Sequence, residues 1–556
     1  MSRPSLQRLL VLAIVAVALV GGPLPRASAE DYTTISGEGS SWAGNAIEAM
    51  RVAVSQFGMT VNYNPSGSSS GRQNWLNGTV DFAASDIPFQ FRPEDGSTPE
   101  SPKADSYAYI PVVAGGTAFM YNLKINGQRV TNLRLSGENV AKIFTGAITK
   151  WDDPALKADN PGLTLPSRNV VPVVRSDGSG STAQFTTWMI KTHKGIWDSY
   201  CSRSGRAPAC GFTSLYPTVA GMIAQSGDQG VSSYVASSFA EGTIGYVNYS
   251  YAIQQDFPVA KVLNSAGYYT EPTPENVSVS LLKARINQDK ASEDYLTQIL
   301  DDVYTDTDKR NYQLSSYSYF ILRTQTTSKF SEDKGKTLGA FAYYAMCQAQ
   351  QQSASLGYSP LPINLVTASF DQIKRIPGVQ VQNINIQSCK NPTFSSDGHN
   401  VLAEKAPQPQ ECDKQGPNQC ATGTGGAKKI STPVNPSASG GSSGGTTGGS
   451  TTGGSTTGET TTGGTTTGGS TTGGTTDGGA LVCDPDTGEC TGGDSTGGDS
   501  GGSRGDSVAS ATPTVLSASS GWSSTQSLIV LISVMVLAFV LCPALLWRNL
   551  SRQDKT

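Results

Sequence analysis

The chain carries its clearest chemical signal where a polar turn separates two apolar segments, between residues 170 and 189. A run of valines predicts a buried strand that ends at Arg175, and residues 182–189 suit the first turns of a helix. The turn that joins them contains Asp177, Ser179, Gly180 and Ser181. Because the first N–H groups of a helix lack partners and lie at the positive end of its dipole, this turn is typical of an anion site. The planar guanidinium of Arg175 adds donors that fit a tetrahedral oxyanion.

Two more turns rich in glycine and serine lie upstream. Residues 35–42 end in Ser41 and Trp42 and precede a segment with helical spacing of apolar residues. Residues 61–71 contain a short strand pattern that runs into a turn with Ser68. Each turn on its own also fits an ordinary helix N-cap. Three donor-rich turns in one chain nevertheless suggest one shared ligand.

A carboxylate follows the next short apolar segment. Residues 79–85 predict a strand, and Asp86 comes directly after it. A solvated loop charge is the common role of an aspartate before a turn. Among hydrogen-bond donors, however, a carboxylate accepts the proton of a protonated oxyanion, and so favours hydrogen phosphate over sulfate.

These segments resemble the phosphate-binding subunit of bacterial phosphate-specific ABC importers. The resemblance extends from about residue 35 to about residue 369 and includes four further motifs, at residues 109–116, 143–154, 242–249 and 357–362. It implies phosphate contacts by motif position, from Ser41, Trp42, Ser68, Asp86, Arg175, Ser179, Gly180 and Ser181. Asp177 is expected to orient Arg175 rather than to touch the ligand. The resemblance implies no catalytic residue, no metal and no cofactor.

Four positions depart from the usual pattern of this family. Ser41 and Trp42 stand where threonine and phenylalanine are common, and Ser181 stands where threonine is common. Serine keeps the hydroxyl, and backbone donors survive each change. Glu38 replaces a small residue in the first glycine turn, and a carboxylate that pointed inward would weaken the binding of a dianion. We therefore expect Glu38 to face solvent.

The order of strand-like and helix-like segments predicts an α/β fold with mainly parallel sheets. The resemblance implies a type II periplasmic-binding-protein-like fold over residues 30–390, with two lobes and a hinge that the chain crosses twice. Lobe one is expected to combine residues 31–115 with 276–390, and lobe two to contain residues 116–275. The ligand is expected to bridge the lobes and to drive closure of the hinge. Residues 391–430 lie beyond the usual end of the family, and nothing in their sequence indicates a function.

Both ends of the chain have the composition of targeting segments. Residues 1–29 predict a signal peptide, and residues 528–547 predict a transmembrane helix with a basic cytoplasmic tail at 548–556. Residues 431–521 are mostly glycine, threonine and serine, which predicts a disordered tether. The chain is therefore expected outside the cytoplasm, anchored in the cell membrane. Its net charge of −4, without a basic stripe, argues against a nucleic-acid partner.

Eight cysteines precede the predicted membrane segment, an even number that suggests disulfides. Close spacing favours the pairs Cys201–Cys210, Cys412–Cys420 and Cys483–Cys490, which leaves Cys347 with Cys389, although many other connectivities are possible. Zinc is a weak alternative because the chain lacks a CxxC pair and has only two histidines. The loop between Cys483 and Cys490 has a fragment of a calcium-binding pattern, with too few ligands to close a site.

The sequence leaves three functions to compare. The leading hypothesis is a membrane-tethered phosphate receptor that delivers its ligand to the permease subunits of an ABC importer and catalyses nothing. A secreted phosphatase or hydrolase would use the same anion site, but no histidine base or nucleophile elbow is evident. The long tether also fits a surface adhesion protein on the same scaffold, and a different oxyanion remains a possible ligand.

Overall fold

A computed structural model describes residues 31–208, 210–395 and 399–435, together with two short strands, β16 (Val482–Cys483) and β17 (Cys490–Thr491). The predicted signal peptide, most of the tether and the predicted transmembrane segment lie outside the described residues. Within the described ranges, no helix combines the length and the apolar character needed to cross a membrane. β16 and β17 pair with each other in antiparallel orientation.

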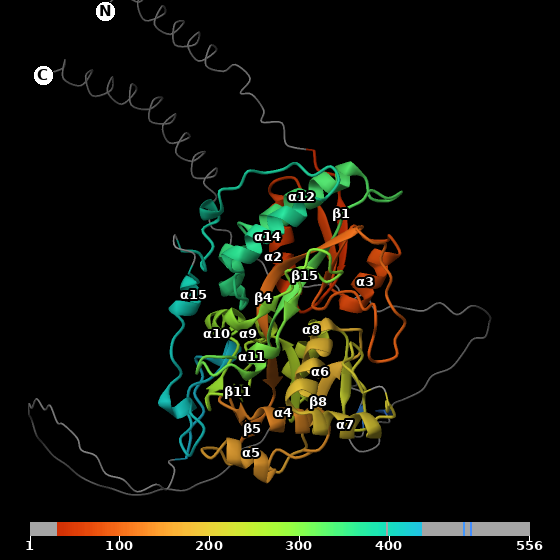
Figure 1. Cartoon of the computed structure of the whole chain (residues 1–556). Coiled ribbons are helices and arrows are strands. Elements are labelled where there is room, and N and C mark those ends of the chain that lie inside the picture. Colours follow the sequence, from red (N-terminus) through yellow and green to blue (C-terminus); the bar gives the residue numbers. More distant parts are fainter. Residues whose placement is uncertain (1–30, 209, 396–398, 436–481, 484–489, 492–556) are drawn as a thin grey trace, which may run out of the picture. The chain divides into compact units, whose positions relative to one another are not determined.

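An eight-stranded sheet in the order β2-β1-β3-β15-β4-β10-β8-β9 runs through both lobes (Figure 1). Its strands are β1 (Ile35–Gly39), β2 (Val61–Asn64), β3 (Phe82–Ser85), β4 (Tyr107–Tyr121), β8 (Val171–Arg175), β9 (Ile223–Gln225), β10 (Thr243–Asn248) and β15 (Ser315–Arg323). The outer pairs β1–β2, β1–β3, β10–β8 and β8–β9 are parallel, as predicted. The central pairs of β15 with β3 and of β4 with β15 and β10 are antiparallel. The sheet is therefore mixed, and the prediction of mainly parallel pairing is wrong for its centre.

Strand β4 changes partner halfway along its length, and this change joins the lobes. Its residues up to Gly116 pair with β15, and its residues from Thr117 onward pair with β10. Two glycines lie at the change because neighbouring rings fill the space beside them. A Cβ on Gly115 would lie 2.8 Å from the Trp42 ring, and one on Gly116 would lie 2.2 Å from Pro272 Cβ. β4 is thus the structural element that the two lobes share.

Helices cover the sheet in two groups (Figure 1). The first group accompanies β1, β3 and β15 and consists of α2 (Gly44–Ser55), α3 (Ser68–Leu76), α12 (Glu332–Met346) and α14 (Ile363–Ile373). In the second group, α8 (Gly227–Ala236) and α9 (Tyr249–Gln254) contact β10, and α7 (Lys194–Arg203) packs against both α4 (Gly137–Phe144) and α6 (Gly180–Thr192). Aromatic contacts fill both cores, with Phe82 against Phe320 and Phe341 in the first and Phe144 against Phe185 and Tyr246 in the second.

Shorter elements complete the described chain. The strands are β5 (Lys124–Ile125), β6 (Gln128–Arg129), β7 (Arg134–Leu135), β11 (Lys261–Leu263), β12 (Tyr269–Thr270), β13 (Arg285–Ile286) and β14 (Gln298–Ile299). The α-helices are α5 (Pro154–Asp159), α10 (Pro274–Ser280), α11 (Asp301–Thr305), α13 (Gln350–Ser353) and α15 (Val401–Glu404). The 3₁₀ helices are η1 (Leu281–Lys283), η2 (Ala354–Leu356), η3 (Ile386–Cys389), η4 (Glu411–Asp413) and η5 (Gly425–Ala427).

Residues 391–435 return to the second lobe, a crossing that the sequence did not predict. Near their start, Thr393 Oγ1 donates to the carbonyl of Leu361, 2.8 Å away, in the first lobe. α15 packs against α10. Further on, the buried guanidinium of Arg134 donates to the carbonyl of Asn418, 2.7 Å away, in a segment that also contacts β11. The segment therefore contacts both lobes.

The structure confirms two of the predicted disulfides, Cys347–Cys389 and Cys412–Cys420. The predicted Cys201–Cys210 bond is wrong, because both residues are free thiols. Burial and a hydrogen bond with Cys210 raise the pKa of Cys201 to about 12, which keeps it in the unreactive thiol form. The backbones of Cys483 and Cys490 lie opposite each other across β16 and β17, but their side chains lie outside the described residues.

The two disulfides are expected to stabilise the fold unequally. They close segments with sequence separations of 42 and 8 residues, and a longer closed loop restricts the unfolded chain more. Replacing Cys347 and Cys389 by alanine should lower the free energy of unfolding by about 2–4 kcal/mol, and replacing Cys412 and Cys420 by less. Denaturant unfolding measures both, with Cys210→Ser as the control that removes a free thiol. Equal losses, or a larger loss for the shorter loop, would contradict the prediction.

Candidate functional site

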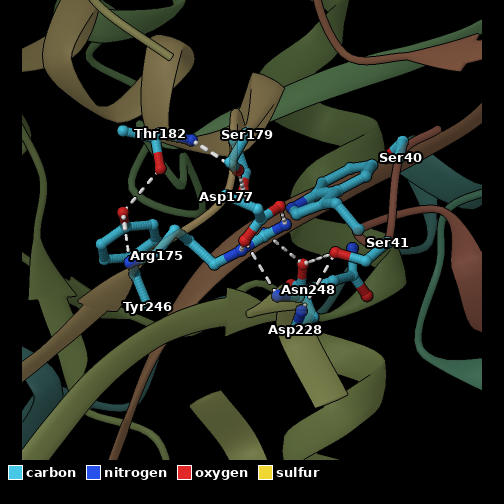
Figure 2. A network of polar contacts seen from close by, with 12 residues as sticks. Ser40, Ser41, Arg175, Asp177, Ser179, Thr182, Asp228, Tyr246 and Asn248 are labelled. Carbon is cyan, nitrogen blue, oxygen red and sulfur yellow. Dashed lines mark hydrogen bonds and ion pairs between the residues drawn. The ribbon is translucent and has the colours of Figure 1, made fainter. Parts of the chain in front are cut away.

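Arg175 lies at the centre of a buried polar network (Figure 2). It is the last residue of β8, and its side chain is 1% exposed. Its Nε and Nη2 donate to the two carboxylate oxygens of Asp177, 2.8 and 2.5 Å away, while Nη1 donates to Asp228 at 2.6 Å and to Ser181 at 3.3 Å. Asp177 also accepts the backbone N–H of Gly227 at 2.9 Å. Fixed in this way, the guanidinium cannot turn freely.

The turn after Arg175 forms the N-terminus of α6, as the sequence predicted. Ser179 is the N-cap, and its hydroxyl accepts the backbone N–H of Thr182 at 3.1 Å. The hydroxyls of Ser179 and Ser181 lie 2.8 Å apart. The hydroxyl of Thr182 lies 2.6 Å from that of Tyr246, which also accepts the backbone N–H of Arg175. The end of β8 and the start of α6 are thus held together by side-chain hydrogen bonds.

The first lobe contributes serines and a buried carboxylate. Asp86 follows β3 directly and is 2% exposed. It accepts the hydroxyl of Ser40 at 2.6 Å and that of Ser68, the first residue of α3, at 3.3 Å. Burial raises the pKa of Asp86 to about 6, and the charge of Asp228 adds to the rise, while the bond from Ser40 opposes it. Asp86 therefore titrates at mildly acidic pH.

The two lobes contact each other directly at these residues. Ser41 Oγ donates to Asp228 at 2.7 Å, and the backbone N–H of Ser69 donates to Gly178 at 2.9 Å. A Cβ on Gly180 would lie 2.6 Å from Ser68 Oγ, which explains why a glycine begins α6. We call the side chains that meet here the interlobe cluster: Ser40, Ser41, Ser68, Asp86, Arg175, Asp177, Ser179, Ser181 and Asp228.

The structure brings most of the predicted site residues into this cluster. Ser41, Ser68, Asp86, Arg175, Ser179 and Ser181 belong to it, Gly180 adjoins it, and Asp177 lies against the guanidinium. The side chain of Trp42 points elsewhere, since its indole Nε1 donates to Thr117 Oγ1 on β4 at 3.1 Å. Glu38 is held away from the cluster by Ser66 Oγ at 2.5 Å and Asn74 Nδ2 at 2.7 Å. It is partly exposed, as expected.

Sequence reasoning missed Asp228, which is fully buried in the first turn of α8. Its carboxylate accepts the backbone N–H of Asn248 at 2.7 Å as well as Arg175 and Ser41. A signal for it was present, because β9, Ser226 and Gly227 repeat the pattern of a strand, a small-residue turn and a helix. Asn248 lies beside Asp228 in Figure 2. Its side-chain Nδ2 is one of the buried atoms without a hydrogen-bond partner in the described chain.

The interlobe cluster contains more carboxylates than cations. Asp177 and Asp228 contact the guanidinium of Arg175, and Asp86 interacts with it electrostatically. Burial alone would lower the pKa of Arg175, but Asp228 and Asp177 outweigh it and raise this pKa. Burial raises the pKa of Asp228, although Arg175 opposes the rise. One buried cation with an excess of carboxylates is a site that binds a proton readily.

The raised pKa of Asp86 predicts a pH-dependent stability. The pKa of Asp86 is about 6 in the folded chain, whereas an unperturbed aspartate has a pKa of 3.8. The folded state therefore binds this proton more tightly than the unfolded state does. This contribution to stability is present below pH ~4 and is lost as the pH rises to ~6, on the order of 2–3 kcal/mol. In Asp86→Asn the stability should no longer fall between pH ~4 and ~6. Denaturant unfolding at several pH values in this range, without added anions, measures the change. Asp198→Asn, at an exposed position, is the control, and parallel pH profiles for Asp86→Asn and wild type would contradict the assignment.

The chain is similar to several known proteins. A family model described as a PBP superfamily domain matches residues 24–349. The phosphate-binding protein PstS of Haemophilus influenzae is 30% identical over 357 residues, which cover 64% of this chain and 95% of that protein. PstS of Pasteurella multocida is 31% identical over 339 residues, covering 60% and 88%. A solved structure of a high affinity periplasmic phosphate-binding protein bound with phosphate has a TM-score of 0.47 at 17% identity, covering 63% of this chain and 100% of that one. The family model spans the whole interlobe cluster.

Proposed function

The chain belongs to the PstS family of phosphate-binding proteins, and we propose that it captures inorganic phosphate at the interlobe cluster. It is an extracytoplasmic receptor for an ABC importer and not an enzyme. The observation that carries the site assignment is the convergence of a buried guanidinium, serine hydroxyls from both lobes and a helix N-terminus. These groups are the donors that a tetrahedral oxyanion requires.

Each lobe supplies one side of the proposed phosphate site. Arg175, Ser179, Gly180 and Ser181 contribute the guanidinium, two hydroxyls and the free N–H groups of α6. Ser41 and Ser68 contribute hydroxyls from the first lobe, and Trp42 contributes its backbone N–H at the approach to α2. In the structure the hydroxyls of Ser41 and Ser68 donate to carboxylates. Rotation about the side-chain bonds redirects them to phosphate oxygens.

In this proposal Asp86 makes the site selective for a ligand that carries a proton. An ionised Asp86 accepts a hydrogen bond and cannot donate one. Hydrogen phosphate carries a proton for this bond, whereas sulfate at neutral pH carries none and would place two unpaired anions together in a buried site. The position of Asp86 between Ser40 and Ser68 supports this role.

Ligand contacts from both lobes would stabilise the closed arrangement. β4 passes through both lobes, and its pair Gly115–Gly116 marks the hinge that we propose for this movement. A closed, loaded receptor presents a surface to the permease that differs from that of the open receptor. Binding of phosphate is thereby coupled to delivery.

The sequence supports an anchored receptor. We propose that residues 1–29 direct export and are removed, and that residues 528–547 hold the chain in the membrane. The tether of residues 431–521 would then span about 50 Å on average as a flexible chain. The receptor would stay close to the importer at a high local concentration.

Removal of the guanidinium should abolish most of the affinity for phosphate. Arg175→Ala deletes the only cation of the interlobe cluster and should weaken binding by about 100-fold or more, since a buried charged contact is worth a few kcal/mol. Isothermal calorimetry with phosphate measures the change. Arg168→Ala removes an arginine of the same lobe that is 46% exposed and pairs with Glu241, and it should bind like the wild type. An Arg175→Ala protein with wild-type affinity would overturn the proposed site.

The ratio of phosphate affinity to sulfate affinity tests whether Asp86 selects the protonated ligand. Wild-type protein should prefer phosphate by about 100-fold or more at neutral pH, because sulfate leaves the buried carboxylate facing an anion. Asp86→Asn has an amide N–H that can donate to sulfate, so the preference should shrink by about tenfold or more. Competition calorimetry gives both ratios. Equal affinities in the wild type, or an unchanged ratio in the variant, would refute the role of Asp86.

A further inference from the structure

Asp228 occupies hydrogen-bond donors that the proposed phosphate site needs. Its Oδ2 accepts Arg175 Nη1 at 2.6 Å and Ser41 Oγ at 2.7 Å, one donor from each lobe. Its Oδ1 accepts the backbone N–H of Asn248 at 2.7 Å. The other two donating nitrogens of the guanidinium are held by Asp177. Asp228 therefore sits where an oxygen of a bound oxyanion would be expected to lie.

The charges make this arrangement unfavourable for an additional anion. Arg175 and Asp228 have side chains that are 1% and 0% exposed, so water does not screen them. With Asp86, Asp177 and Asp228 all ionised, the cluster has a net charge of −2 around a single guanidinium. A phosphate dianion that entered this cluster would meet like charges at short distance in a buried environment.

Among the residues that the structure describes, Arg175 is the one cation found against Asp228. The charged and titratable groups around Asp228 and its partner Arg175 are Asp177, Asp86 after β3, Tyr246 on β10, Tyr251 on α9 and Tyr358 after η2. β9 contributes no titratable side chain, and β4 contributes no charged one. Burial raises the pKa of all three tyrosines, so they remain neutral. The cluster can therefore reduce its repulsion of an entering phosphate by protonation of one of its carboxylates.

We propose that Asp228 is a specificity-determining residue whose carboxylate competes with phosphate for Arg175 and Ser41, so that phosphate binds together with a proton taken up by Asp228. This inference rests on the proposed function and adds a second, ligand-linked proton to the site. The geometry carries it, because one carboxylate oxygen accepts from the guanidinium of one lobe and the hydroxyl of the other.

The proton balance is simple. One proton from solvent joins the Asp228 carboxylate, and the neutral carboxyl group releases Arg175 Nη1 and Ser41 Oγ to the oxygens of phosphate. The carbonyl oxygen of the carboxyl group keeps the N–H of Asn248, and the new O–H donates to phosphate. No covalent bond to phosphate forms or breaks. Above the pKa of Asp86, where that carboxylate stays ionised, the affinity for phosphate should consequently rise as the pH falls, beyond the change that protonation of phosphate itself causes.

Calorimetry of phosphate binding at pH 7, in buffers with different ionisation enthalpies, counts the protons taken up. Wild-type protein should take up about one proton more than Asp228→Asn, because Asp86 and the ligand titrate in both proteins. At pH 8, Asp228→Asn should bind phosphate at least about tenfold more tightly than wild type, since the amide does not hold Arg175 as a charge does. Its affinity should also change less steeply between pH 6 and 8.

Controls separate this role from a structural one. Asp413→Asn removes a nearly buried carboxylate that pairs with Lys261 at 2.7 Å in the same lobe, away from the cluster, and should keep the wild-type proton count. Asp228→Ser also removes the carboxyl group and should take up as few protons as Asp228→Asn. Thermal unfolding shows whether each variant is folded. Equal proton uptake in wild type and both Asp228 variants overturns the inference alone. Wild-type protein that binds no phosphate overturns the proposed function as well.

Discussion

The ion pairs of one buried guanidinium, that of Arg175, hold the interlobe cluster together. Arg175 contacts Asp177 within its own lobe, and its other partner, Asp228, bonds across to Ser41. Breaking a buried pair of this kind costs about 3–5 kcal/mol because a charge is left without compensation. The orientation of the guanidinium, the start of α6 and the contact between the lobes therefore depend on one another.

The fold positions this network with few elements. β8 ends at Arg175, and the turn into α6 places free N–H groups and two serine hydroxyls beside it. β3 ends next to Asp86, and α3 begins at Ser68. β4 carries the connection between the lobes. A ligand that exchanged side-chain partners in the cluster would act on both lobes at once, which is how the proposed capture of phosphate would couple to movement.

Most residues of the interlobe cluster were predictable from the sequence, because each lies in a local pattern of a strand followed by a polar turn. The end of β8 with α6 and the end of β3 with Asp86 follow from hydrophobic runs that stop at polar residues. The antiparallel centre of the sheet was not predictable in this way, since it depends on β15, which lies far along the chain from β3 and β4. Asp228 was missed because an aspartate in the first turn of a helix usually serves the helix itself.

The error at Cys201 and the return of residues 391–435 have the same origin. The close spacing of Cys201 and Cys210 predicted a disulfide, but in the structure the two thiols form a hydrogen bond instead. The long final segment has little periodicity, and its place is set by tertiary contacts such as those of Arg134. Local patterns specify which residues start and end elements, whereas such partners depend on the completed fold.

A crystal structure of the protein with bound phosphate would show whether the interlobe cluster is the phosphate site. We expect one phosphate enclosed between the lobes, within hydrogen-bond distance of the Arg175 guanidinium, the hydroxyls of Ser41 and Ser68 and the first N–H groups of α6, with Asp86 at hydrogen-bond distance from one phosphate oxygen. Phosphate found outside the interlobe cluster, with Arg175 still occupied by Asp177 and Asp228 and the serine contacts unchanged, would contradict it.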